Sequence, residues 1–113
     1  MSAGEPGWVR ICPQNRLEPE RGVAALVGGT QVAIFLTYDG NLYAMENYDP
    51  YARAWVLSRG IVGTRGGAPT VASPMHKQAY DLRTGVCLDL PGVAVRTFEV
   101  RRWHDWVEVW CPP

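Results

Sequence analysis

The sequence predicts an all-β fold, on three observations. The 113 residues include nine prolines and twelve glycines, and no long run with helical periodicity survives between them. The apolar segments are short and rich in valine, isoleucine and aromatic residues, which favour strands. Pairs of turn-forming residues separate these segments at short intervals. The length suits one domain, expected over residues 1–113 with an ordered core of about 7–111.

Nine strands are expected in chain order. They lie near Trp8–Cys12, Gly22–Val27, Gln31–Thr37, Asn41–Met45, Ile61–Thr64, Thr70–Ala72, Gln78–Asp81, Val95–Arg101 and Val107–Trp110. Turn residues stand between them in the right places to reverse the chain. These turns are Gly28-Gly29, Asp39-Gly40, Gly66-Gly67, Arg83-Thr84-Gly85 and Trp103-His104-Asp105.

The longest segment without a clear strand runs from Glu46 to Gly60, too long for an ordinary hairpin loop. Within it, Ala52–Leu57 is expected to form a short helical turn. Asp49 is placed to cap that turn or to form an Asx-turn, and Pro50 suits its first position.

Charge and composition exclude several classes of function. Eleven basic and eleven acidic residues balance, which argues against a nucleic-acid partner. No apolar run approaches the roughly 20 residues of a membrane-spanning helix, and the first residues do not form a signal peptide. Cys12, Cys87 and Cys111 are too widely spaced for a metal motif and are expected to be reduced, mostly buried thiols. A cytoplasmic protein is therefore expected.

Two loops carry a resemblance to a known family. NYDPY at Asn47–Tyr51 and SPMH at Ser73–His76, followed by YDL and Thr84-Gly85, resemble the two ligand loops of Rieske domains. That family has CxH in the first loop and CPxHG in the second. The resemblance spans Trp8 to Trp110 and implies stacked antiparallel sheets in the Rieske-like, ISP-domain architecture.

The positions of the four cluster ligands carry the wrong chemistry. By this resemblance Asp49 and Ser73 stand at the cysteine positions, Tyr51 and His76 at the histidine positions. A Rieske cluster needs two thiolates on one iron and two imidazoles on the other. Because only His76 is retained, we expect no iron–sulfur cluster, no metal and no catalytic residue on this chain.

The replacements themselves resemble one subfamily, with the pattern N-x-D-P-[FY], then VLSRGI, then SP-x-x-KQ. This subfamily comprises the small subunits of assimilatory NAD(P)H-dependent nitrite reductases, which reduce nitrite to ammonium in nitrate assimilation. The resemblance implies a large-subunit partner that holds FAD, siroheme and an iron–sulfur cluster. This chain would then be a subunit of an oxidoreductase without a redox centre of its own.

Three rival functions remain open from the residues alone. One is a Rieske-type electron-transfer ferredoxin, which requires a cluster. Another is an adaptor for a different oxidoreductase. The third is a free-standing enzyme or mononuclear metal site built from Asp49, Tyr51 and His76.

Two further expectations concern the loops. The space left by a cluster is expected to be filled by the Tyr51 ring, Met75 and a hydrogen bond from Asp49 to Ser73 or His76, because an empty or unpaired site is costly. Tryptophan and arginine are enriched at binding hot spots. The candidate interface residues are Arg53, Trp55, Arg59, Met75 and Lys77.

Overall fold

The computed structural model describes residues 7–112, and these residues form an all-β fold. They contain twelve strands, and each pairing between these strands is antiparallel. Two short 3₁₀ turns, η1 (Gln14–Arg16) and η2 (Leu57–Arg59), are the helical elements of this part of the chain. Neither approaches the length of a helix that could cross a membrane.

The strands form three sheets and one small hairpin. The first sheet has the order β1 (Gly7–Pro13), β12 (Trp106–Cys111), β11 (Val100–Trp103). The second has the order β10 (Thr97–Phe98), β4 (Leu42–Glu46), β3 (Thr30–Leu36), β2 (Gly22–Val27). The third has the order β7 (Ile61–Arg65), β8 (Ala68–Ala72), β9 (Ala79–Asp81). The hairpin pairs β5 (Tyr48–Asp49) with β6 (Ala54–Trp55).

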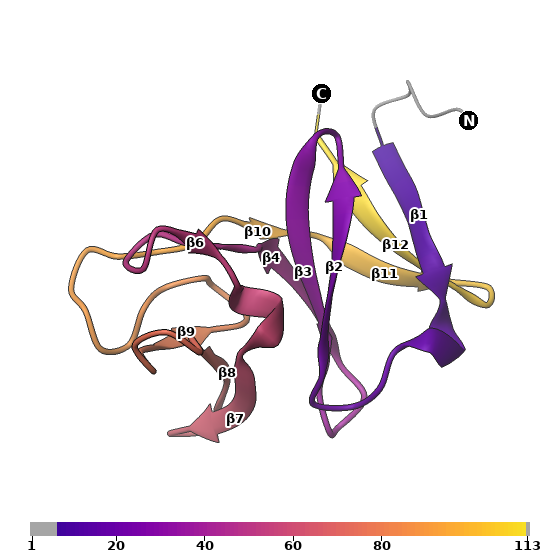
Figure 1. The fold of residues 1–113 in the computed structure, drawn as a ribbon. Coiled ribbons are helices and arrows are strands. Elements are labelled where there is room, and N and C mark those ends of the chain that lie inside the picture. Colours follow the sequence, from indigo (N-terminus) through magenta and orange to yellow (C-terminus); the bar gives the residue numbers. More distant parts are fainter. Residues whose placement is uncertain (1–6, 113) are drawn as a thin grey trace.

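The second sheet lies between two apolar clusters, one on each of its faces. Both faces are apolar because successive side chains of a strand point to opposite sides. Val32, Ile34 and Ala44 lie in one cluster with Val107 and Val109 of β12. The intervening residues face the third sheet, in a cluster comprising Ala33, Phe35, Met45, Leu57, Val62, Val71, Tyr80, Leu82, Cys87 and Val95. Figure 1 shows the result: β2 and β3 lie between β1 and β12 on one side and β7, β8 and β9 on the other.

The sequence-based strands are confirmed for most of the chain. Gly28-Gly29 forms the two-residue turn between β2 and β3, with φ values of 56° and 84°, as the primed hairpin turns require. Gly66-Gly67 closes the hairpin of β7 and β8 in the same way. Trp8 pairs with Trp110 across β1 and β12, with ring centroids 5.4 Å apart, so the two indoles pack against each other on the sheet.

Two expectations about secondary structure were wrong. The strand expected at Val95–Arg101 is two strands, because the chain leaves the second sheet after Phe98 and joins the first at Val100. The helical turn expected at Ala52–Leu57 does not form. Arg53 has a φ of 57°, which a right-handed helix cannot accommodate, and Ala54–Trp55 instead pairs with Tyr48–Asp49.

The three cysteines are free, as expected, although only Cys87 is fully buried; Cys12 and Cys111 are partly exposed. The first and last described strands start and end together, since Gly7 pairs with Cys111. Both ends of the described chain therefore lie at one end of the first sheet, away from the loops between β5 and β6 and between β8 and β9 (Figure 1).

A pair of glycines tests how tightly the loop after β9 is packed. A Cβ added to Gly85 would lie 1.8 Å from the Val95 carbonyl oxygen, whereas one added to Gly92 would meet nothing within 4 Å. Both glycines have positive φ, 80° and 77°, so alanine carries a similar backbone cost of about 1–2 kcal/mol at either site.

We therefore expect Gly85→Ala to lower the free energy of unfolding by about 2 kcal/mol more than Gly92→Ala, because only the first change overpacks the loop. Urea denaturation of the two variants and the wild type measures the difference. Equal losses would contradict the close approach of Gly85 to Val95.

Candidate functional site

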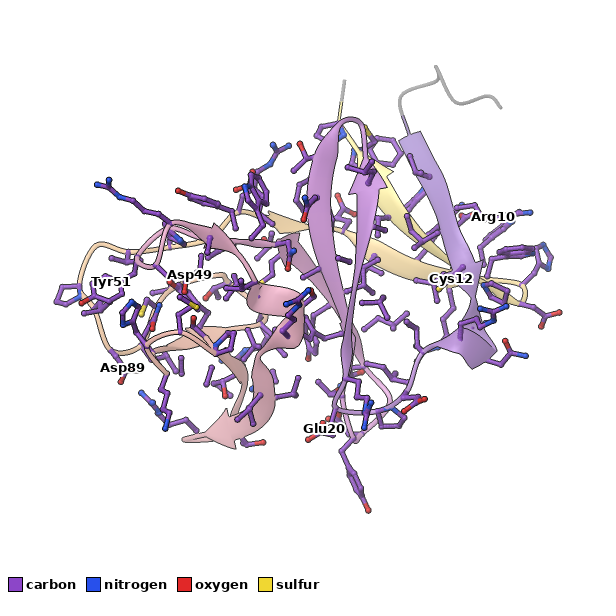
Figure 2. The ribbon with its side chains drawn as sticks, viewed as in Figure 1. Arg10, Cys12, Glu20, Asp49, Tyr51 and Asp89 are labelled. Atoms are coloured by element: carbon purple, nitrogen blue, oxygen red, sulfur yellow. The ribbon has the colours of Figure 1, made fainter. Side chains whose placement is uncertain are left out.

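The two loops singled out by the sequence lie side by side. The first comprises residues 49–53 and joins β5 to β6; the second comprises residues 73–78 and joins β8 to β9. We call the end of the molecule that they form the loop tip. Figure 2 shows Asp49 and Tyr51 at this tip, at the opposite end of the molecule from Arg10 and Cys12 of β1.

The buried Asp49 carboxylate connects the two loops through hydrogen bonds. Its side chain is 0% exposed, and Ser73, which is 1% exposed, donates its hydroxyl proton to Oδ2 over 2.5 Å. The Tyr80 hydroxyl donates to Oδ1 over 2.8 Å. Gln78 Nε2 lies 3.0 Å and 3.1 Å from the two carboxylate oxygens and 3.2 Å from the Tyr80 hydroxyl. Side chains from the second loop and β9 therefore converge on one carboxylate of the first loop.

Backbone donors complete the coordination of Asp49. The N–H groups of Tyr51 and Ala52 donate to Oδ1 over 3.0 Å and 3.3 Å. This is the Asx-turn expected at Asp49 before Pro50, and it orders the first loop locally. In the second loop, the Ser73 hydroxyl accepts a hydrogen bond of 3.2 Å from the Met75 N–H while donating to Asp49.

Burial and hydrogen bonding act on Asp49 in opposite directions. Burial of the carboxyl tends to raise its pKa, but the hydrogen bonds from Ser73, Tyr80 and the backbone outweigh burial, and the net pKa lies below the usual value. Burial raises the pKa of the Tyr80 hydroxyl, and its hydrogen bond to Asp49 raises it further. Asp49 is thus a buried anion and Tyr80 a neutral donor.

Asn47 holds the first loop from the other side. Its Oδ1 accepts the Ser58 N–H over 2.7 Å, and its Nδ2 donates to Gln31 Oε1 over 3.1 Å and to the Trp55 carbonyl over 3.3 Å. The β5–β6 hairpin is therefore fastened both to β3 and to η2. The Trp55 ring packs against Tyr48, with ring centroids 4.9 Å apart.

The predicted filling of the loop tip was correct in one part and wrong in another. Asp49 does bond to Ser73, as one of the two expected alternatives. Tyr51 and Met75, however, are 52% and 54% exposed, so they do not fill the interior. The Tyr51 ring instead lies edge-on to His76, with centroids 5.0 Å apart. The interior is occupied by Gln78 and Tyr80, because these side chains can donate to a carboxylate and the Met75 side chain cannot.

These contacts do not fit an iron–sulfur cluster. The Asp49 carboxylate already accepts from two hydroxyls, one amide and two backbone N–H groups, and it lies in hydrogen-bond contact with Ser73 at the other cysteine position. Among residues 7–112, the one buried side-chain polar atom without a partner is Gln78 Oε1, an acceptor that cannot donate to a bridging sulfide. The donor set therefore suits a protein-only network.

A mononuclear metal site fits no better. Asp49 is buried and its oxygens are occupied, while Tyr51 and His76 point outward. Within the described residues there is no group of three or more histidine, cysteine, aspartate or glutamate side chains arranged to hold a metal ion. The structure brings Asp49 and Ser73 together, and Tyr51 and His76 together, but it does not merge the two pairs.

All five candidate interface residues are exposed. Trp55 is 48% exposed, and Met75, in the second loop of the tip, is 54% exposed. Arg53 is the last residue of the first loop, Lys77 is the last but one of the second, and Arg59 ends η2. A cleft of about 500 Å³ opens beside the second loop, lined by Tyr51, Arg65, His76, Lys77, Gln78, Asp89 and Leu90.

Comparisons with known proteins agree with this architecture. Residues 7–110 match the Rieske-like [2Fe-2S] domain family. The chain is 40% identical over 95 residues to the NADH nitrite reductase small subunit of Escherichia coli K12, covering 83% of this chain and 88% of that protein. It is 38% identical over 103 residues to the NAD(P)H nitrite reductase large subunit of Klebsiella oxytoca, covering 87% of this chain but 11% of that protein. The solution structure of the NAD(P)H nitrite reductase small subunit from Erwinia carotovora superimposes with a TM-score of 0.78 at 34% identity, covering 100% of this chain and 85% of that one.

Replacing Asp49 tests whether its charge ties the loops together. We expect Asp49→Asn to lower the free energy of unfolding by about 3 kcal/mol, because the amide turns one acceptor into a donor among groups that all donate. Asp105→Asn, at an exposed turn, is the control and should change stability by less than about 0.5 kcal/mol.

The difference between wild type and Asp49→Asn should depend on pH. Since the pKa of Asp49 is lower in the folded than in the unfolded state, its stabilisation is complete above the unfolded pKa of about 3.9 and is lost as pH falls through the folded value. Chemical denaturation from neutral pH down to below pH 4 should show the two stabilities converging. A constant difference would mean that the charge of Asp49 is not what the network requires.

Proposed function

The chain belongs to the Rieske-like domain family, among the small subunits of NAD(P)H nitrite reductases, and from this membership we propose that it is a non-catalytic companion of the large subunit. In this role it takes part in the reduction of nitrite to ammonium without carrying electrons. It covers or orients a redox centre of the large subunit, or stabilises that subunit's active conformation.

One observation carries the proposal: the Asp49–Ser73 hydrogen bond occupies the place where the family pattern has two cysteines. A chain that carried electrons would need a cluster there. The oxygens of Asp49 and Ser73 are instead committed to each other and to Tyr80 and Gln78. Hydrogen bonds among these four side chains connect the two loops in the interior of the loop tip.

The relatives support a large-subunit partner. The Escherichia coli relative is a small subunit by name, and the match to the Klebsiella oxytoca large subunit covers 11% of that chain. In the Klebsiella protein, therefore, a segment similar to this domain belongs to the same polypeptide as the rest of a large subunit. A similar domain joined covalently to a large subunit in one species supports non-covalent binding of this chain to a large subunit.

The chemistry of the reaction falls to the partner under this proposal. FAD, siroheme and an iron–sulfur cluster are placed on the large subunit, and the assembly works in the cytoplasm in nitrate assimilation. This chain contributes no cofactor ligand and no catalytic residue. The choice between NADH and NADPH then depends on the nucleotide site of the large subunit.

The loop tip is the face proposed to dock. It presents the half-exposed side chains of Tyr51 and Met75 and the exposed cations Arg53 and Lys77. The exposed Trp55 of β6 and Arg59 of η2 follow the first loop in the chain. Aromatic, methionine and arginine side chains are enriched in protein–protein interfaces. The Asp49 network beneath the tip holds these side chains on an ordered backbone, which lowers the entropic cost of docking.

Iron analysis separates this function from that of a ferredoxin. We expect the purified chain, even after anaerobic incubation with iron and sulfide, to hold far less than one iron per chain and to lack the visible absorption of a [2Fe–2S] centre. Near-stoichiometric iron and acid-labile sulfide would overturn the proposal and support a ferredoxin. A Rieske ferredoxin treated in parallel confirms that the incubation works.

A tryptophan pair tests the docking face. Trp55→Ala should weaken binding to the co-expressed large subunit about tenfold, since a half-exposed tryptophan at an interface centre contributes on the order of 1–2 kcal/mol. Trp103→Ala, at the far end of the molecule, removes a side chain of similar exposure, 46% against 48%, and should leave binding unchanged. Binding is measured by biolayer interferometry. Equal effects of the two changes would move the interface away from the loop tip.

A further inference from the structure

The two loops of the tip repeat one backbone turn. The first reads Asp49-Pro50-Tyr51-Ala52-Arg53, and the second reads Ser73-Pro74-Met75-His76-Lys77. In each, the fifth N–H donates to the first carbonyl: Arg53 to Asp49 over 2.7 Å, and Lys77 to Ser73 over 2.9 Å. In each, the side chain of the first residue also accepts the third N–H. The two turns therefore share both their hydrogen bonds and their order of residue types, with proline second and a cation fifth.

Both turns end on a cation with an unfavourable backbone. Arg53 has a φ of 57° and Lys77 a φ of 66°, in the left-handed region that glycine adopts without a steric penalty. The Rieske loop pattern has glycine at the position of Lys77. Strained residues of this kind persist where the surrounding structure holds them and tend to gather at functional sites. The structure therefore retains a long cationic side chain twice where glycine would relieve strain.

Neither cation has a carboxylate partner in the part of the chain that the structure describes. Arg53 and Lys77 are exposed, and neither forms an ion pair in the described residues, whereas Arg65 nearby is paired with Asp89 at 2.7 Å. The only carboxylate inside the two turns is Asp49, which is buried and occupied by Ser73, Tyr80 and backbone donors. Their positive charges therefore face solvent from the ends of two adjacent turns.

We propose that Arg53 and Lys77 are matched cationic anchors, presented by the twin turns, that dock on an acidic surface of the large subunit. The inference rests on the proposed function and adds the chemistry of the partner surface. Tyr51 and Met75, the third residues of the same turns, are exposed and supply the apolar part of the contact. The Tyr51–His76 ring contact and the Asp49–Ser73 hydrogen bond hold the turns in a constant relative position.

Charge complementarity selects this occupant over two others. A second copy of this chain, docked tip to tip, would place Arg53 and Lys77 against the same cations, which is unfavourable. A nucleic acid would require basic residues well beyond the tip, but the chain as a whole has eleven basic and eleven acidic residues. An acidic protein surface matches the local positive charge and requires no basic residues elsewhere on this chain.

Glycine substitution distinguishes a binding role of Arg53 and Lys77 from a purely structural role. The double variant Arg53→Gly/Lys77→Gly removes both cations and also relieves the backbone strain. We expect its Tm to be equal to or above that of the wild type, while its affinity for the purified large subunit falls more than about tenfold at low ionic strength. The wild-type affinity should weaken with added salt, and the double variant should lose most of that dependence.

Two further variants complete the design. His104→Gly relieves the same kind of strain, φ 56°, in the turn between β11 and β12, and should leave binding unchanged. Arg53→Gln/Lys77→Gln removes the charges without adding glycine flexibility and should weaken binding as much as the glycine pair.

The outcomes separate the inference from the function on which it rests. If both double variants bind as tightly as the wild type and with the same salt dependence, the anchor role of Arg53 and Lys77 is wrong, but the proposed docking function stands. If only the glycine double variant loses affinity, binding requires loop rigidity and not charge, and the anchor role is again wrong. If the wild type does not bind the large subunit, the proposed function is wrong, and so is the anchor role that rests on it.

Discussion

A buried carboxylate imposes the strictest requirement in this molecule. Removing a charge from water is expensive unless each of its oxygens is met by donors, and Asp49 has no counter-charge in contact with it among residues 7–112. Its donors come from its own turn, from the facing turn and from β9. These segments are distant in the sequence, so satisfying Asp49 fixes the first loop, the second loop and the last strand of the third sheet relative to one another.

The sheets make that convergence possible. β8 and β9 pair through Val71 and Tyr80, whose side chains enter the core shared with β3 and β4. Tyr80 therefore reaches Asp49 with its hydroxyl while its ring is packed among Phe35, Leu57 and Leu82. Asn47 acts similarly from the end of β4, tying the hairpin to β3 and η2. The loop tip is irregular in shape, but it is fastened to regular strands on both sides.

Short apolar segments and turn glycines were sufficient to predict most of the fold, because β2 and β3 are such segments joined by Gly28-Gly29, and β7 and β8 are joined by Gly66-Gly67. The loop pattern also gave Ser73 as one of two alternative partners of Asp49, the other being His76, and the structure has the bond to Ser73. Gln78 and Tyr80 were missed as members of the network. Tyr80 reads as an ordinary strand aromatic, and nothing local in the sequence shows that its hydroxyl meets a carboxylate 31 positions away. The helical turn at Ala52–Leu57 failed for a related reason: the αL conformation of Arg53 is imposed by the hydrogen bonds of the turn, not by the propensity of arginine.

The same network explains why ligand loops would persist without a cluster to bind. A cluster crosslinks two loops through its ligands; here Asp49 crosslinks them through Ser73, Tyr80 and Gln78, so the loop tip stays ordered although the means of crosslinking has changed. An ordered tip keeps Tyr51 and Met75 exposed instead of allowing them to collapse into the interior, and it can hold Arg53 and Lys77 in conformations that an unsupported loop would abandon. Preorganisation of this kind serves binding as well as it serves electron transfer. Under the proposed function, the docking surface does not depend on a redox centre, because the Asp49 network connects the two loops through protein groups.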